Sequence, residues 1–229
     1  MGGWEAQDVS TARVAAARWT VLLACTVLGL APGCAAPEYT YVKNTANRTY
    51  FKVPSSWRVI DEKALTQLSG ASAAPENDSG WAVAYDAAQD PSAAHLVGND
   101  TPEPIVYASV QPVPQEAREQ VSLDSLRNLL MPVTPEARAA SSSSGTAFSG
   151  FSLVSDAELT AQPGFRGVHE IFQYRVQGGP LQTFDQTVYV NKDASKVYAL
   201  LLRCSNECYQ ARRAEVETVT ASFTVKEGS

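Results

Sequence analysis

The sequence has little of what most catalytic, metal and membrane-spanning sites need. Its 229 residues include two histidines and four cysteines, and the longest apolar run, residues 19–31, is too short to cross a membrane, which takes roughly 20 residues. It contains no Gly-x-Ser-x-Gly motif and no glycine-rich phosphate loop. The net charge is −6, so the basic excess that nucleic acids and anionic lipid surfaces attract is missing. We therefore expect no bound cofactor and no nucleic-acid partner.

A leader is the clearest feature that is present. The apolar run follows Arg13 and Arg18 and leads to Pro32-Gly33-Cys34. Its length suits the apolar core of a signal peptide. A basic flank, a short apolar core, a small residue and a cysteine together resemble a bacterial lipoprotein signal peptide. That resemblance implies that residues 1–33 are removed, that Cys34 carries lipid, and that the protein is held at the outer face of the cell membrane.

Three alternatives to this interpretation remain open. Ala31 and Pro32 stand where lipoproteins usually have Leu and then Ala or Ser. Cys25 is a rival lipidation site, although it leaves only a short apolar stretch after Arg18. Cleavage of the ordinary secretory type would leave Cys34 unmodified. A true start at Val9 or Val14 is a further hypothesis, because the acidic residues before it are unusual in such a leader.

The remaining cysteines fit an exported domain. If the leader is removed and Cys34 carries lipid, Cys204 and Cys208 are left, and an even pair in an exported domain predicts a disulfide. The ring of five residues would contribute roughly 2 kcal/mol to stability, less than a long loop would. A metal pair is the alternative, but His95 and His169 are both distant in the sequence, so we expect no metal site.

The alternation of apolar residues predicts an α+β fold with an antiparallel sheet flanked by helices. Expected strands are 41–44, 49–53, 81–85, 105–110, 148–159, 166–176, 181–190, 196–203 and 223–225. Helices are expected after Asp61, from Ser122 to Met131, and from Ser205 or Asn206 to Ser222. Residues 196–203 are apolar on both faces, as a central strand requires.

Residues 45–229 are long enough for one domain, and we expect residues 34–44 to be a tether before it. Within the domain, residues 137–147 (ARAASSSSGTA) are of low complexity and predict a mobile Ser-rich loop. A linker between two domains is the alternative. We prefer the loop because neither half alone offers enough strands for a closed core.

A family resemblance rests on the two ends of this domain. Phe51-Lys-Val-Pro-Ser-Ser-Trp57 resembles the Phe-x-Val-Pro-x-x-Trp opening of PsbP-like domains, and Lys196–Arg203, a helix and Ser222–Val225 are similar to their final strand, helix and strand. The LpqN/LpqT-type lipoproteins of actinobacteria combine such a domain with a lipidated cysteine. The resemblance, over residues 45–226, implies an antiparallel sheet flanked by helices and a binding or scaffold role. It transfers no catalytic residue.

Few residues suggest chemistry. His169, beside Glu170, is the best-placed candidate base, although alternation places it on the polar side of a strand and His95 falls in an irregular loop. Carboxylates at residues 76–103 match no calcium loop, so we interpret them as a solvated acidic surface. Four aromatic residues could line a ligand groove, although at strand spacing they are more often core; they are Trp57, Trp81, Tyr85 and Tyr107.

The function that follows is a lipid-anchored cell-envelope protein with a non-enzymatic domain that binds or scaffolds. Its expected partners are the membrane, through the lipid, and an unknown envelope protein or a small apolar ligand. The alternatives are a secreted hydrolase that uses His169 and a small-ligand carrier.

Overall fold

Two antiparallel sheets form the framework of the computed structural model, which describes residues 37–69, 80–143, 148–160 and 163–226. The larger sheet has seven strands in the order β3-β4-β5-β9-β8-β7-β6, and the smaller sheet has three in the order β1-β2-β10. The strands are β1 (Tyr39–Asn44), β2 (Thr49–Pro54), β3 (Arg58–Val59), β4 (Trp81–Asp86), β5 (Ile105–Pro112), β6 (Phe148–Leu159), β7 (Phe165–Val176), β8 (Leu181–Asn191), β9 (Lys196–Ser205) and β10 (Thr224–Val225). The predicted α+β class with an antiparallel sheet is therefore confirmed.

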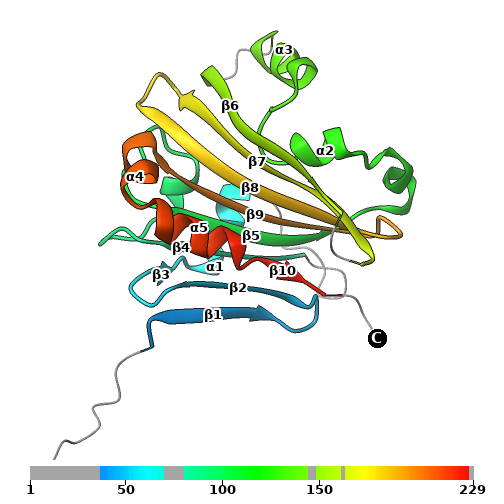
Figure 1. Cartoon of the computed structure of the whole chain (residues 1–229), viewed down its shortest axis with the longest axis horizontal. Helices are drawn as coiled ribbons and strands as arrows, with labels where there is room; N and C mark the ends of the chain where they lie inside the picture. The colour runs from blue at the N-terminus through cyan, green and yellow to red at the C-terminus, as the bar shows by residue number, and fades with distance from the viewer. Residues whose placement is uncertain (1–36, 70–79, 144–147, 161–162, 227–229) are drawn as a thin grey trace, which may run out of the picture. The chain divides into compact units, whose positions relative to one another are not determined.

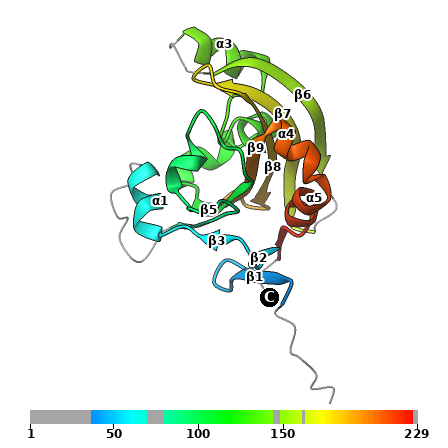
Figure 2. The ribbon, with the colours of Figure 1, turned by 90° about the vertical axis from the view of Figure 1, so that its left-hand side faces the viewer.

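Helices cover both faces of the larger sheet (Figures 1 and 2). They are α1 (Glu62–Ser69), η1 (Ala93–Leu96), η2 (Gln115–Gln120), α2 (Leu123–Arg127), α3 (Pro135–Ser143), α4 (Asn206–Ala211) and α5 (Arg213–Ala221). On one face, α4, α5 and the smaller sheet pack against β8 and β9, and on the other face α2 packs against β7 and β8. Within the described residues, none of the helices combines the length and the apolar character that crossing a membrane takes.

Strand β9 lies at the centre of the core. Tyr198, Leu200 and Leu202 point toward α5 and the smaller sheet, whereas the alternate residues Val197 and Ala199 point toward α2. All of them are buried. The double apolar pattern of residues 196–203 therefore predicted the central strand correctly.

The helix starts that the sequence predicts are confirmed. Ser122 forms a capping box with Ser125 at the start of α2. The Ser205 hydroxyl accepts a hydrogen bond from the backbone of Cys208 in α4, and the Asp61 carboxylate accepts bonds from Lys63 and Ala64 in α1. Each side chain satisfies a backbone N–H that the first helical turn leaves unpaired.

Three boundaries differ from the prediction. Residues 41–44, which the sequence assigns both to the tether and to a strand, are a strand, because Tyr39–Asn44 forms β1 and pairs along its whole length with β2. The expected Ser-rich loop at residues 137–147 is wrong for residues 137–143, which are helical in α3; residues 144–147 lie outside the described residues. The single final helix is divided at Arg212 into α4 and α5.

Of the carboxylates expected to form a solvated acidic surface, Asp90, Asp100 and Glu103 are exposed as expected, whereas Asp86 at the end of β4 is not. Asp86 is buried and accepts hydrogen bonds from the backbone of Ala88 and Ser92 and from His95 Nδ1, the last at 2.6 Å. The buried guanidinium of Arg203 donates to two further carbonyls of this segment, each at 2.9 Å. A carboxylate and a guanidinium from the sheet therefore fix a segment that has little regular structure.

Candidate functional site

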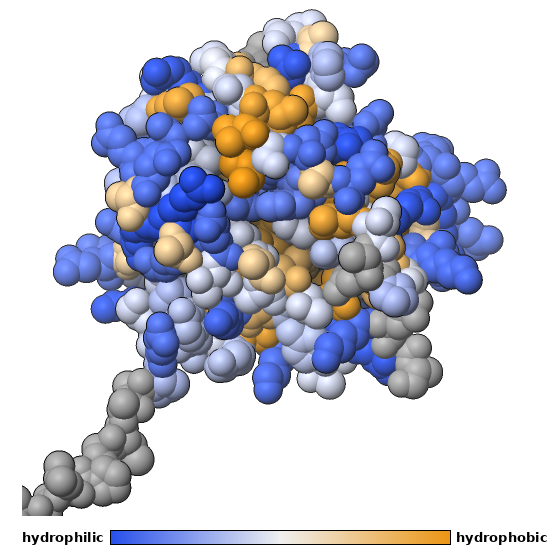
Figure 3. Space-filling view, viewed as in Figure 1, coloured by the Kyte–Doolittle hydropathy of each residue, from blue (hydrophilic) through white to orange (hydrophobic). Residues whose placement is uncertain are grey.

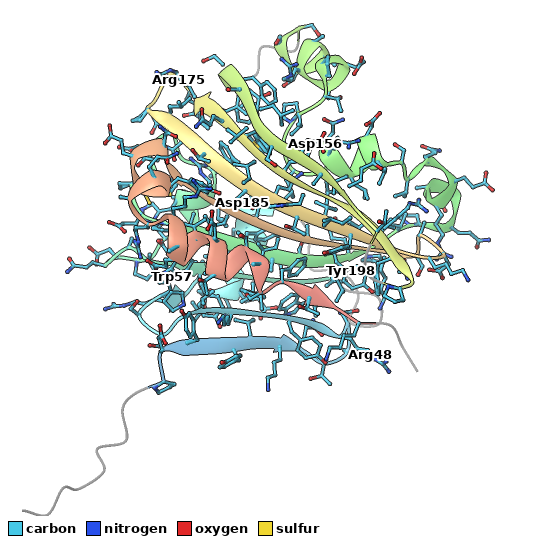
Figure 4. The ribbon with its side chains drawn as sticks, viewed as in Figure 1. Arg48, Trp57, Asp156, Arg175, Asp185 and Tyr198 are labelled. Atoms are coloured by element: carbon cyan, nitrogen blue, oxygen red, sulfur yellow. The ribbon has the colours of Figure 1, made fainter. Side chains whose placement is uncertain are left out.

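His169 lies on the face of the larger sheet that carries α4 and α5, as the alternation in β7 predicts. Its Nε2 is 2.9 Å from Oδ1 of Asp185 on the neighbouring strand β8. The Tyr209 hydroxyl, from α4, donates to the other oxygen of Asp185 at 2.9 Å. Figure 4 shows Asp185 on β8 near the junction of α4 and α5. We call these three residues the His169 network.

The His169 network is held in a polar strip under α4. The hydrogen bond to Asp185 raises the pKa of His169, against the opposing effect of partial burial. Beside it, the Gln173 amide and the Thr183 hydroxyl both donate to the Asn206 side chain, at 2.7 and 3.2 Å. Because Asn206 and Tyr209 belong to α4, these bonds attach that helix to β7 and β8.

The His169 network lacks the groups that a hydrolase would need. Both oxygens of Asp185 already accept hydrogen bonds, and the carboxylate is 1% exposed. Among the described residues, no Ser, Thr or Cys side chain is hydrogen-bonded to the His169 ring, so no activated nucleophile is present there. The geometry supports a structural role for His169.

Glu170, next to His169 in the sequence, lies on the opposite face of the sheet and belongs to a separate network. Its side chain is fully buried. Gln186 donates to its Oε2 at 3.0 Å, while Arg127 Nε is 3.8 Å from its Oε1, which has no hydrogen bond. Burial raises the pKa of Glu170 from 4.5 to about 7.

Arg127 joins this buried carboxylate to the surface. It donates to Asp156 on β6 and to Asp124 on α2. Its Nη2 atom is 3.7 Å from Oε1 of Glu158. Its side chain is only 14% exposed, so the guanidinium holds α2 against β6 and β7 with little contact to water. Nowhere in the described part of the chain do three or more His, Cys, Asp or Glu residues form a cluster that could hold a metal ion.

The four aromatic residues predicted to line one groove do not share a face. Trp57 is 3% exposed, belongs to the core under α5, and donates through Nε1 to Glu215 at 2.8 Å. Trp81 and Tyr85 pack against that same core. Tyr107 alternates to the other side of β5 and packs under α1 and η1. The strand spacing favoured core positions for these aromatic residues, and their packing against two different cores agrees with that.

A different hollow is open to solvent between the smaller sheet and α5. It measures about 460 Å³. One of its lining residues, Arg212, forms ion pairs with Glu103 and with Glu215, the latter at 2.6 Å. We call this hollow the α5 groove; its lining residues are Glu38, Tyr39, Pro54, Ser56, Arg212, Ala214, Glu215 and Thr218.

Sequence reasoning missed the α5 groove because its walls come from the two ends of the domain. Glu38 and Tyr39 lie at the start of β1. Arg212 and Glu215 lie more than 170 residues later in the sequence, at α5. No short motif joins residues so far apart. The one local signal is Trp57 in the Pro-Ser-Ser-Trp sequence, whose indole bonds directly to a residue of the groove.

Cys204 and Cys208 are buried neighbours, which the structure describes as free thiols, and their disulfide stays a prediction. Cys204 ends β9 and Cys208 lies in the first turn of α4, which the sequence spacing correctly places together. The hydrogen bond between the two thiols raises the pKa of Cys204 and lowers that of Cys208.

Comparison with known proteins shows the fold. No family model and no curated protein matches the chain. The solution structure of the PsbP protein CyanoP from Synechocystis sp. PCC 6803 is similar, with a TM-score of 0.51 and 14% identity, over 86% of this chain and 98% of that chain. The PsbP-like fold that the sequence predicts is therefore confirmed.

Two further solved structures have lower TM-scores. LpqN, involved in cell envelope biogenesis of Mycobacterium tuberculosis, has a TM-score of 0.44 and 17% identity over 82% of this chain and 91% of its own. The Ran-binding protein Mog1p of Saccharomyces cerevisiae has a TM-score of 0.36 and 9% identity over 83% of this chain and 96% of its own. The fold assignment rests on CyanoP alone.

The raised pKa of Glu170 predicts a specific dependence of stability on pH. The folded state holds this proton up to about pH 7, whereas the unfolded chain releases it near 4.5, so stability falls as pH rises between these values. The wild type should lose about 1–2 kcal/mol more between pH 5 and pH 8 than the Glu170→Gln variant. Urea unfolding at both pH values measures the difference. The control is Glu158→Gln, on the exposed strand β6, and an unchanged pH dependence in Glu170→Gln would contradict the assignment.

Proposed function

We propose that this chain is a lipid-anchored, extracytoplasmic protein whose PsbP-like domain binds a partner protein without catalysis. The observation that carries the binding role is the α5 groove, which is open, charged and formed by firmly packed elements. Its charged side chains, with the ion pairs of Arg212, suit a protein segment. A small apolar ligand would instead need an enclosed and mainly apolar cavity.

The proposed anchor lies close to the α5 groove along the chain. Cys34 precedes Glu38, at the edge of the groove, by four residues, and four extended residues span at most about 14 Å. A lipid on Cys34 would therefore keep the groove near the membrane surface. Two acyl chains hold a protein stably, whereas one holds it only marginally.

The non-enzymatic part of the proposal is supported by the His169 network. The His169 ring is engaged by a buried carboxylate that also binds Tyr209, and among the described residues no nucleophile is hydrogen-bonded to it. The bonds instead connect β7, β8 and α4. Nothing in this arrangement favours the secreted hydrolase over the binding function.

For Cys204 and Cys208, we propose that the adjacent thiols become a disulfide after export by exchange with an extracytoplasmic disulfide oxidant, which takes up the two electrons and the two protons. Their contact in the structure and the lowered pKa of Cys208 both favour the reaction, because the thiolate is the attacking form. The exported protein should be lighter than its reduced form by two hydrogen atoms, which intact-mass spectrometry before and after reduction detects. Two free thiols in exported material would contradict the proposal.

The anchor is tested by the Cys34→Ser variant. Since the hydroxyl cannot carry the thioether-linked lipid, the protein should move from the membrane fraction to the soluble fraction. The matched control is Cys25→Ser, which should stay with the membrane. Fractionation followed by immunoblotting gives the result, and a Cys34→Ser protein that remains with the membrane would mean that another feature anchors it.

The partner is sought by crosslinking at the α5 groove. A photoreactive residue at Ala214, an exposed lining position, should trap a specific protein in intact cells. The same residue at Ala117, on the distant η2 segment, is the control. The trapped band should weaken when Arg212→Ala removes a charge that lines the groove. Equal crosslinking from both positions would show that the groove is not the binding surface.

A further inference from the structure

Strand β6 is a long free edge of the larger sheet. It has 12 residues, pairs with β7 alone among the described strands, and is exposed along nearly its whole length. Figure 3 shows hydrophobic side chains on the surface along this strand. At the middle of the strand, Leu153 is 48% and Val154 58% exposed. A strand at the edge of a sheet presents unpaired N–H and C=O groups, which can pair with another chain.

The other edge strands of the two sheets have features that discourage pairing with another chain, and β6 lacks these features. The opposite edge of the larger sheet, β3, has two residues. In the smaller sheet, β10 also has two residues, and β1 carries Lys43. Short strands and lysines both discourage pairing with other chains. The sequence of β6, FSGFSLVSDAEL, contains no Lys, Arg or Pro.

Only the second half of β6 is regular enough to accept a strand. The register with β7 shifts between Ser149 and Ser152 and again between Leu153 and Ser155. From Ser155 to Leu159 the pairing is continuous. Since bulges interrupt the ladder on their strand, the first half is blocked and residues 155–159 remain open.

The two faces of this segment differ in chemistry. Asp156 and Glu158 project to the face that carries α2, and the Glu158 side chain is 58% exposed. Ser155, Ala157 and Leu159 project to the other face and are small or apolar. Arg127 already pairs with Asp156, so Glu158 carries most of the accessible charge. A complementary strand would place basic residues on the first face and apolar residues on the second.

A second copy of this chain does not meet that requirement. If two β6 strands paired antiparallel about Ala157, Asp156 of each copy would lie opposite Glu158 of the other. Shifting the pairing to centre on Asp156 or on Glu158 places each of these carboxylates opposite itself. Like charges directly opposite each other destabilise a strand pair. The acidic residues therefore oppose self-association and favour a basic partner.

We propose that residues 155–159 of β6 add a strand from another protein, one in which Lys or Arg alternates with apolar residues. Main-chain hydrogen bonds would supply affinity, and the alternating side chains would supply specificity. This interaction rests on the binding function proposed above and gives the domain a second binding surface. That surface depends neither on the α5 groove nor on the lipid.

The experiment uses the full chain and a synthetic peptide in which Lys-Val is repeated four times. Hydrogen exchange should slow in residues 155–159 when the peptide is added, because their outward amides become paired. Glu158→Lys should weaken binding about fivefold, measured by fluorescence anisotropy, because it opposes the lysines. Glu116→Lys, an exposed position on η2 with the same charge change, should leave the affinity within about twofold.

Two further peptides separate strand addition from simple charge attraction. A copy with proline in place of the two central valines keeps the charge and loses backbone donors, so it should not protect β6. A Glu-Val repeat should not bind. Equal binding by the proline peptide, protection at another segment, or slowed exchange of residues 155–159 that grows with protein concentration alone would overturn the proposal. Failure of the Ala214 crosslink would leave these results unchanged, so the two proposals fail separately.

Discussion

The burial of β9 on both faces is the constraint on which the rest of the structure depends. Its alternating side chains belong to two different cores, one under α5 and the smaller sheet, the other under α2. At its end the same strand carries the buried Arg203, which fixes the segment after β4, and Cys204, which contacts α4. A strand with no solvent face leaves its neighbours no freedom of register, since a shift by one residue would exchange the two cores.

Buried polar groups fix the strands and helices that pack around β9. Asp185 on β8 bonds to β7 and α4, Glu170 on β7 bonds to β8 and lies near Arg127 of α2, and Asp86 at the end of β4 bonds to its own loop. Each would cost free energy if it were buried without partners. The helices are therefore fixed by specific bonds as well as by apolar contact.

The sequence predicts what local chemistry and alternation control. The caps at Ser122 and Ser205 and the opposite faces of His169 and Glu170 follow from such rules. Features that depend on distant contacts are missed. The serines of α3 are weak helix formers, and Arg138 of that helix stacks over the ring of Phe151 at 4.2 Å, a contact that no local pattern reveals. The sequence indicated a solvated Asp86 because its hydrogen-bond partners come from the irregular loop that follows it. The α5 groove was missed because it joins residues from the two ends of the domain.

The two proposed surfaces belong to different sheets of the domain. Strand β1, at the edge of the α5 groove, lies at the bottom of both views of the ribbon, and the start of β6, beside α3, lies at the top (Figures 1 and 2). The proposed lipid is joined to the chain near β1, so it would keep the α5 groove near the membrane, whereas the proposed contact at β6 needs no lipid. Two such surfaces would let the domain hold two partners at once, which is what the proposed scaffold role requires.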